Sequence, residues 1–220
     1  MANPVPTNVV ITYKYAIQMQ HLHRTLRSFQ QRLINNYLDK LMNGGLLLLV
    51  DPIIRYRRRS IFVLPTLDID VGFMESLNVV KYFLQNERRK RLWFAEYTGK
   101  NGFHLYFRYL VLIDNPELFR TPAVLRQTIF KYINRAILAN VDTVSSIRDI
   151  PILRIGYRPD TGRTAIPVLN LDPSWIRKVS SERGLKGVFE TSQDLVKYIL
   201  NYIVPPKYIT LRQYWTLSRI

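Results

Sequence analysis

Strand-like segments alternate with segments of helical periodicity along this chain, and this alternation limits the possible folds more than any other feature. β-Branched and aromatic residues predict strands at 9–15, 46–50, 61–71, 93–97 and 104–112, and short strands within 151–171. Apolar residues at helical spacing predict helices over 21–42, 74–92, 125–138 and 195–203. Because the order is not a strict β-α-β repeat, we expect a mixed α/β fold.

The charge balance points to an anionic partner. The 220 residues include 32 Lys plus Arg but only 16 Asp plus Glu, so the formal net charge is +16. Self-repulsion of this size is tolerated most readily when the partner is a polyanion. The sequence therefore favours a nucleic-acid-binding protein of one domain.

Two absences narrow the chemistry and the location. The chain has no cysteine, which excludes disulfides, zinc sites built on thiolates and cysteine nucleophiles. Its longest apolar run, residues 46–50, is far shorter than the roughly 20 residues that cross a bilayer, and the first residues show no secretion signal. We therefore expect a cytoplasmic protein with no membrane partner.

A pair of acids within residues 67–71 is the first candidate for chemistry. Asp68 and Asp70 are two apart, so on a strand they would share one face. Neighbouring carboxylates need a shared proton, cations or a metal, and hard oxygen ligands suit Mg²⁺ or Mn²⁺. The alternative is a strand that leaves the core with two solvated acids on its polar face.

A glycine-containing turn between two strands is the second candidate. Thr98, Lys100 and Asn101 lie in this turn, and His104 begins the next strand. Backbone N–H groups in such a turn can bind phosphate, and His104 could add a donor. The alternative is an ordinary hairpin in which His104 packs near the strand end.

A third segment supplies one more acid and several arginines. Asp142 precedes a predicted hairpin that carries Arg154, Arg158 and Arg163 around the turn 159–162. Arginine side chains match phosphate oxygens with two parallel hydrogen bonds. The alternative is an ordinary basic hairpin.

Together the three segments resemble the catalytic subunit of archaeo-eukaryotic primases. That family has an apolar-Asp-apolar-Asp strand, a Ser-x-x-Gly-x-His-type hairpin, and then a third Asp followed by a segment that ends in Thr-Gly-Arg. The resemblance covers residues 60–170, with the motifs in the family's order. It implies an RRM-like palm with a largely antiparallel sheet flanked by helices. The division expected is a single domain over 1–220, with a strand-helix module (1–58), a catalytic core (59–172) and a C-terminal extension (173–220).

The resemblance also implies roles for individual residues. Two divalent ions, Mg²⁺ or Mn²⁺, would be bound by Asp68, Asp70 and Asp142. The triphosphate of the incoming nucleotide would contact Thr98, Lys100, Asn101, His104, Arg154 and Arg158. The activity implied is primer synthesis on single-stranded DNA from nucleoside triphosphates, by a two-metal mechanism. A large primase subunit or a helicase would be an accessory partner.

Three departures from the family pattern are visible. Thr98 replaces the usual Ser, and Arg158 stands where the family has a second His. The cysteine-bearing zinc module of cellular primases cannot form in a chain without cysteine. These departures suggest a reduced form, of the kind that a virus or plasmid encodes and that acts in the host cell.

Two other functions remain open. A rolling-circle nuclease would pair a metal held by His21 and His23 with Tyr198 or Tyr202 as nucleophile. Helical spacing turns the two histidines apart and places both tyrosines on an apolar stripe, which favours core packing. The other candidate is a nucleic-acid-binding replication subunit without activity, which would explain the charge but not the three acids.

Overall fold

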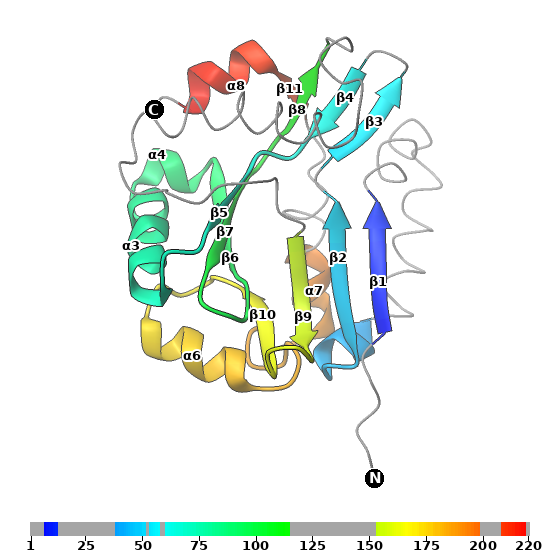
Figure 1. Ribbon diagram of the computed structural model, residues 1–220, viewed down its shortest axis with the longest axis vertical. Coiled ribbons are helices and arrows are strands. Elements are labelled where there is room, and N and C mark those ends of the chain that lie inside the picture. Colours follow the sequence, from blue (N-terminus) through cyan, green and yellow to red (C-terminus); the bar gives the residue numbers. More distant parts are fainter. Residues whose placement is uncertain are drawn as a thin grey trace.

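The computed structural model describes residues 7–12, 38–51, 53–57, 60–114, 153–198 and 208–218. Seven of the strands in these ranges form one sheet, in the order β1-β2-β9-β10-β6-β7-β5 (Figure 1). Their bounds are β1 Thr7–Thr12, β2 Leu46–Asp51, β5 Thr66–Ile69, β6 Trp93–Tyr97, β7 Phe103–Phe107, β9 Leu153–Arg158 and β10 Arg163–Pro167.

The six strands from β2 to β5 are each antiparallel to their neighbours, and β1 pairs with β2 in parallel. The mixed α/β class expected from the sequence is confirmed. β5 lies at one edge of the sheet, paired with β7, and it carries the first candidate acid. The edge position leaves one side of β5 without a strand neighbour among the described residues.

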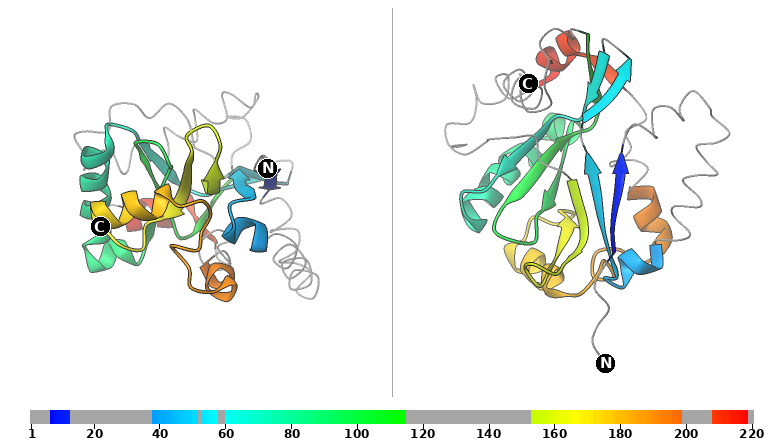
Figure 2. Two further views of the ribbon diagram at one scale, coloured as in Figure 1. Left: turned by 90° about the horizontal axis from the view of Figure 1, so that it is seen from below. Right: turned by 45° about the vertical axis from the view of Figure 1, so that its right-hand side comes forward.

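A second sheet, β11-β8-β4-β3, lies at one end of the molecule with α8 beside it (Figure 2). Its strands are β3 Ile53–Arg57, β4 Ser60–Val63, β8 Leu110–Ile113 and β11 Tyr208–Thr210. The predictions of single strands over 61–71 and 104–112 were wrong. The first breaks at Pro65, which has no N–H to donate, and the second breaks after Phe107. Both segments pass from the small sheet to the large one or back at the same place, between β4 and β5 and between β7 and β8. There the N–H of Phe107 donates to the carbonyl oxygen of Pro65 at 2.9 Å.

The helix predicted over 74–92 is two helices, α3 Phe73–Leu84 and α4 Glu87–Lys90. The side chain of Asn86 accepts hydrogen bonds from the N–H groups of Arg88 and Arg89, so a new helix begins there. α3 buries Leu77, Val80 and Phe83 and packs against β6 and β7.

The remaining helices lie in the C-terminal part of the chain. α6 Pro173–Ser181 begins at the cap Asp172, packs against β10, and was not predicted. α7 Ser192–Tyr198 begins three residues before the expected start at 195, and α8 Leu211–Ser218 was also not predicted. In the described ranges no helix has the length and apolar character needed to cross a membrane.

Several predicted elements fall outside the described residues. They are the helix at 125–138, the strand at 9–15 beyond residue 12, and most of the helix at 21–42, of which 38–42 are helical.

The core lies between the large sheet and its helices. Its largest fully buried side chains include Tyr97, Phe103, Tyr106 and Phe107, all from the hairpin of β6 and β7. Phe73 of α3 packs its ring 5.6 Å from those of Tyr97 and Phe103. The hairpin is therefore held rigidly from the face that α3 covers.

Candidate functional site

Three titratable residues lie in one row across three neighbouring strands. Asp68 of β5 is paired with His104 of β7, and His104 is paired on its other side with Glu96 of β6. Directly paired residues point to the same face of a sheet, so the three side chains share a face. Because Phe103 and Tyr97 alternate with His104 and Glu96, this is the face turned away from α3.

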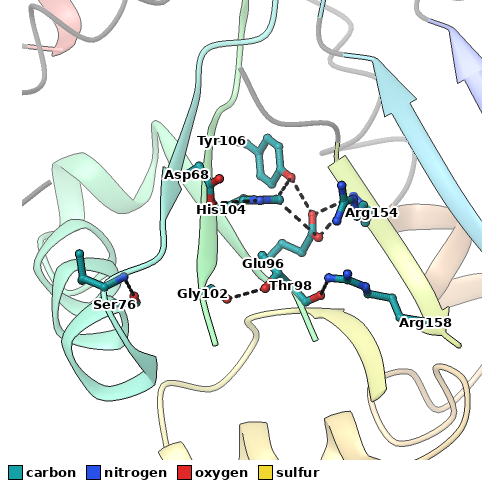
Figure 3. Close-up of polar contacts among 10 residues, drawn as sticks. Asp68, Ser76, Glu96, Thr98, Gly102, His104, Tyr106, Arg154 and Arg158 are labelled. Carbon is teal, nitrogen blue, oxygen red and sulfur yellow. Dashed lines mark hydrogen bonds and ion pairs between the residues drawn. The ribbon is translucent and has the colours of Figure 1, made fainter. Parts of the chain in front are cut away.

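A chain of hydrogen bonds connects these side chains (Figure 3). Nδ1 of His104 lies 2.8 Å from the hydroxyl of Tyr106, which donates to Oε2 of Glu96 at 2.7 Å. On the other side of the ring, Nε2 lies 3.4 Å from Oδ1 of Asp68. Glu96, Tyr106 and His104 are buried, whereas the Asp68 side chain is 41% exposed. The network therefore runs from the interior to a carboxylate in contact with solvent.

This environment keeps the His104 ring charged. Burial alone lowers the pKa of His104, but hydrogen bonds to Asp68 and Glu96 and their negative charges outweigh burial and raise it to about 9. At neutral pH both ring nitrogens therefore carry protons. Nδ1–H donates to Tyr106, and Nε2–H faces Asp68.

Glu96 is the residue of this network that sequence reasoning missed. It is 1% exposed, and both its carboxylate oxygens lie 3.3 Å from the backbone N–H of Arg154 on β9. The available signal was a lone acid inside the apolar strand 93–97, whose partners could not be read from the sequence.

The expected pair of acids differs in its surroundings. Asp68 lies within β5, but Asp70 follows the end of the strand and is exposed. The turn of the hairpin approaches here, because a Cβ on Gly102 would lie 2.7 Å from the carbonyl oxygen of Ile69 and 3.3 Å from Cα of Asp70. The structure thus places Asp70 beside the glycine turn.

The turn between β6 and β7 has a closed, well-bonded base. The N–H and hydroxyl of Thr98 both donate to the carbonyl oxygen of Gly102, at 3.1 and 3.0 Å. Lys100 and Asn101 are exposed at its tip. Thr98 therefore uses its hydroxyl to close the turn, and the tip presents one cationic and one amide side chain to solvent.

Arg158 supports the turn, a role that the sequence did not suggest. The residue is 8% exposed, with Nη1 donating to the carbonyl oxygen of Thr98 at 2.7 Å and Nε donating to Asp160 at 3.1 Å. Nη2 also bonds to Asp160, whose pKa is lowered by this hydrogen-bonded pairing. These contacts make Arg158 a support of the turn. Its role as a nucleotide contact stays a prediction.

Other candidate residues have clear positions. Arg154 is half-buried on β9, near Glu96. Tyr198 is buried and packs its ring 5.5 Å from Phe189, as expected for a core residue. Trp93 and Tyr106 are core residues too. Asp142, His21, His23 and Tyr202 lie outside the described residues.

The three acids expected to bind metal ions lie partly inside and partly outside the described residues. Within the described ranges, no group of three or more His, Asp or Glu side chains is arranged to hold a metal ion. Asp68 and Asp70 nevertheless offer accessible carboxylate oxygens, the donors that Mg²⁺ and Mn²⁺ prefer. These two residues fit part of the expected donor set, and the assignment of the set stays a prediction.

Comparisons of the chain with protein-family models, with curated proteins and with solved structures find no match.

Proposed function

We propose that this chain is a primase or primase-polymerase, which joins nucleotides on single-stranded DNA without a pre-existing primer. The observation that carries the proposal is the position of the charged His104 ring, buried beside the partly exposed carboxylate of Asp68. A cation next to a metal-type carboxylate is what a site for a metal-bound triphosphate requires. The antiparallel sheet from β2 to β5 supports an RRM-like palm as its scaffold.

In this proposal the acidic residues bind metal ions and the basic residues contact phosphates. Asp68, Asp70 and Asp142 would hold two divalent ions, which when bound supply activation of the attacking 3′-hydroxyl and neutralisation of the phosphates. His104 on β7, Lys100 in the turn and Arg154 on β9 would supply the positive charge that stabilises phosphate oxygens. The turn at 98–102 orients Lys100 and Asn101, because Thr98 and Arg158 fix its base.

The net positive charge of the chain supports single-stranded DNA as its proposed template. A net charge of +16 favours binding of the phosphate backbone, with an affinity that falls steeply as salt rises. The partners proposed are therefore single-stranded DNA and nucleoside triphosphates, in the cytoplasm. The buried position of Tyr198 does not suit a tyrosine nucleophile, whereas His21, His23 and Tyr202 lie outside the described residues.

The test is incubation of the full chain with single-stranded DNA, Mg²⁺ or Mn²⁺ and labelled nucleotides, with no primer supplied. We expect labelled oligonucleotides whose synthesis depends on the template. DNA binding without any product would instead indicate a non-catalytic binding subunit. Cleavage with a covalent tyrosyl–DNA adduct would indicate the nuclease.

A further inference from the structure

We propose that Glu96 is a positioning residue that sets two expected phosphate contacts at once, His104 through the hydroxyl of Tyr106 and Arg154 through its backbone N–H. The inference rests on the proposed function, because it concerns residues expected to contact the nucleotide. Glu96 itself is too deeply buried to touch a substrate, so it acts through its neighbours.

The first link fixes the orientation of the His104 ring. An imidazole can rotate about its Cβ–Cγ bond and exchange its two edges unless both are held. Here the Tyr106 hydroxyl accepts from Nδ1 at 2.8 Å because its own proton is donated to Glu96 at 2.7 Å. If Glu96 did not accept the hydroxyl proton, the hydroxyl could donate to Nδ1 instead. Nδ1 would then carry no proton, and only Nε2 of the ring would be a donor. The carboxylate thus sets the direction of both hydrogen bonds, from Nδ1 to the hydroxyl and from the hydroxyl to Glu96.

The position of Tyr106 is itself well determined. Its ring stacks on that of Phe94 with centroids 4.9 Å apart, and no part of the side chain is exposed. The hydroxyl therefore cannot move far to find another acceptor. The orientation of the His104 ring therefore depends on Tyr106, which the stacked ring of Phe94 on β6 holds in place.

The second link fixes strand β9. The pairing of β9 with β10 extends from Arg158–Arg163 to Gly156–Ala165, and the next residues of β10 pair with β6. Two residues beyond Gly156, the N–H of Arg154 meets the Glu96 carboxylate, at 3.3 Å from each oxygen. The side chain of Glu96 therefore takes the place of a ladder hydrogen bond. It holds β9 beside β6 where β10 does not pair with β9.

The bond to the N–H of Arg154 needs an acceptor at position 96 but not a negative charge. A buried acid costs free energy unless it is paired, so an apolar residue is the cheaper way to fill a strand interior. Glu96 is compensated by two hydrogen-bond donors, the hydroxyl of Tyr106 and the N–H of Arg154, and Oε1 lies 3.8 Å from Nδ1 of His104. The other ring nitrogen of His104 lies 3.4 Å from Oδ1 of Asp68. The contacts of Glu96 therefore lead to the proposed site.

The experiment uses histidine labelling, because the chain has only three histidines and two of them can be assigned by substitution. Nitrogen-15 NMR of the metal-free full chain reports whether the Nδ1 proton of His104 is protected from exchange with water. We compare wild type with Glu96→Gln, which keeps the side-chain shape but leaves one acceptor oxygen, without charge, for the two donors of Tyr106 and Arg154. Tyr106→Phe keeps the stacked ring and removes only the hydroxyl. Glu190→Gln, at an exposed position, is the matched control.

We expect a protected Nδ1 proton in wild type and in Glu190→Gln, and its loss in Glu96→Gln and Tyr106→Phe. In the primer-synthesis assay, the KM for nucleotide should rise about tenfold in Glu96→Gln, more than kcat falls, as for loss of one charge-assisted contact. A protected proton in both variants would overturn the positioning role whatever the activity.

The two proposals can fail separately. If wild type makes no primers while the ring signal still depends on Glu96, the proposed function is wrong and the positioning geometry stands. If wild type makes primers and both Glu96→Gln and Tyr106→Phe keep its KM, Glu96 does not position the nucleotide contacts. Should Glu96→Gln fail to fold, Tyr106→Phe alone decides, because it leaves the carboxylate and its bond to β9 in place.

Discussion

Arg158 donates a hydrogen bond of 2.7 Å from Nη1 to the carbonyl oxygen of Thr98, which lies 60 residues earlier in the chain. The contact joins the hairpin of β9 and β10 to the turn between β6 and β7. Gly99 makes this approach possible, because a Cβ there would lie 3.2 Å from the N of Ala165. The two hairpins therefore interlock at the turn that carries Lys100 and Asn101.

Arg158→Ala should destabilise the fold by about 1–3 kcal/mol, because it leaves the buried Thr98 carbonyl without its donor. Asp160→Ala should cost less, about 0–1 kcal/mol, since the Asp160 side chain is 61% exposed and its ion pair is screened. Urea unfolding of both variants measures the difference. Equal losses would show that the ion pair, and not the bond to Thr98, is what Arg158 contributes.

The same variant has a functional consequence. Loosening the turn displaces Lys100 and Asn101, so Arg158→Ala should raise the KM for nucleotide more than it weakens template binding. Arg212→Ala, at an exposed position on α8, serves as the charge-matched control. Equal effects of Arg158→Ala on KM and template binding would argue against a role of this turn in triphosphate binding.

Gly102→Ala should destabilise the chain by about 1–3 kcal/mol, because its Cβ would lie 2.7 Å from the backbone oxygen of Ile69 and backbone cannot yield as a side chain does. Gly162→Ala is the matched comparison. Gly162 has φ +67° but nothing within 4 Å of a Cβ, so only backbone strain of about 1 kcal/mol is expected there. Thermal unfolding of the two variants tests the ranking. A larger loss for Gly162→Ala would mean that β5 and the turn do not pack closely.

Stability should depend on pH through His104. Its pKa is raised from 6.5 to about 9 in the folded chain, so its contribution is fully present below pH 6.5 and is lost as the pH rises through about 9. The loss of unfolding free energy is at most about 3.4 kcal/mol. Urea unfolding at a series of pH values, without divalent ions, measures it.

His104→Gln is the control for this pH dependence, because it removes the titrating group. The difference in unfolding free energy between wild type and His104→Gln should shrink from pH 6.5 to pH 9. Parallel curves for the two proteins would contradict a charged His104 in the folded state.

The sequence predicted those features that depend on local patterns. The strand expected at 93–97, the start of the strand expected at 104–112 and the turn between them follow from aromatic and apolar residues around Gly99 and Gly102, and all are present. The division of the helix over 74–92 also had a local signal, since Asn86 is a good N-cap that was read as part of a continuous apolar period.

The features missed depend on partners distant in the sequence. Glu96 is bonded to the backbone of Arg154, 58 residues later, and nothing near Glu96 indicates that partner. Likewise Pro65 signals a break in a strand, but not that the chain passes there from one sheet to another. Arg158 was read as a phosphate ligand because its charge is visible in the sequence, whereas its contact with Thr98 is set by tertiary packing.

The most direct test of the account measures template-dependent nucleotide incorporation by Asp68→Asn and Asp70→Asn, beside wild type and the exposed control Asp39→Asn. Asp70 is exposed, so Asp70→Asn should change the unfolding free energy by less than about 0.5 kcal/mol. Single-stranded DNA binding should persist in both variants. Incorporation should fall by about 100-fold or more in both and stay unchanged in the control. Incorporation at the wild-type rate by either variant would contradict the assignment of these carboxylates to the metal ions.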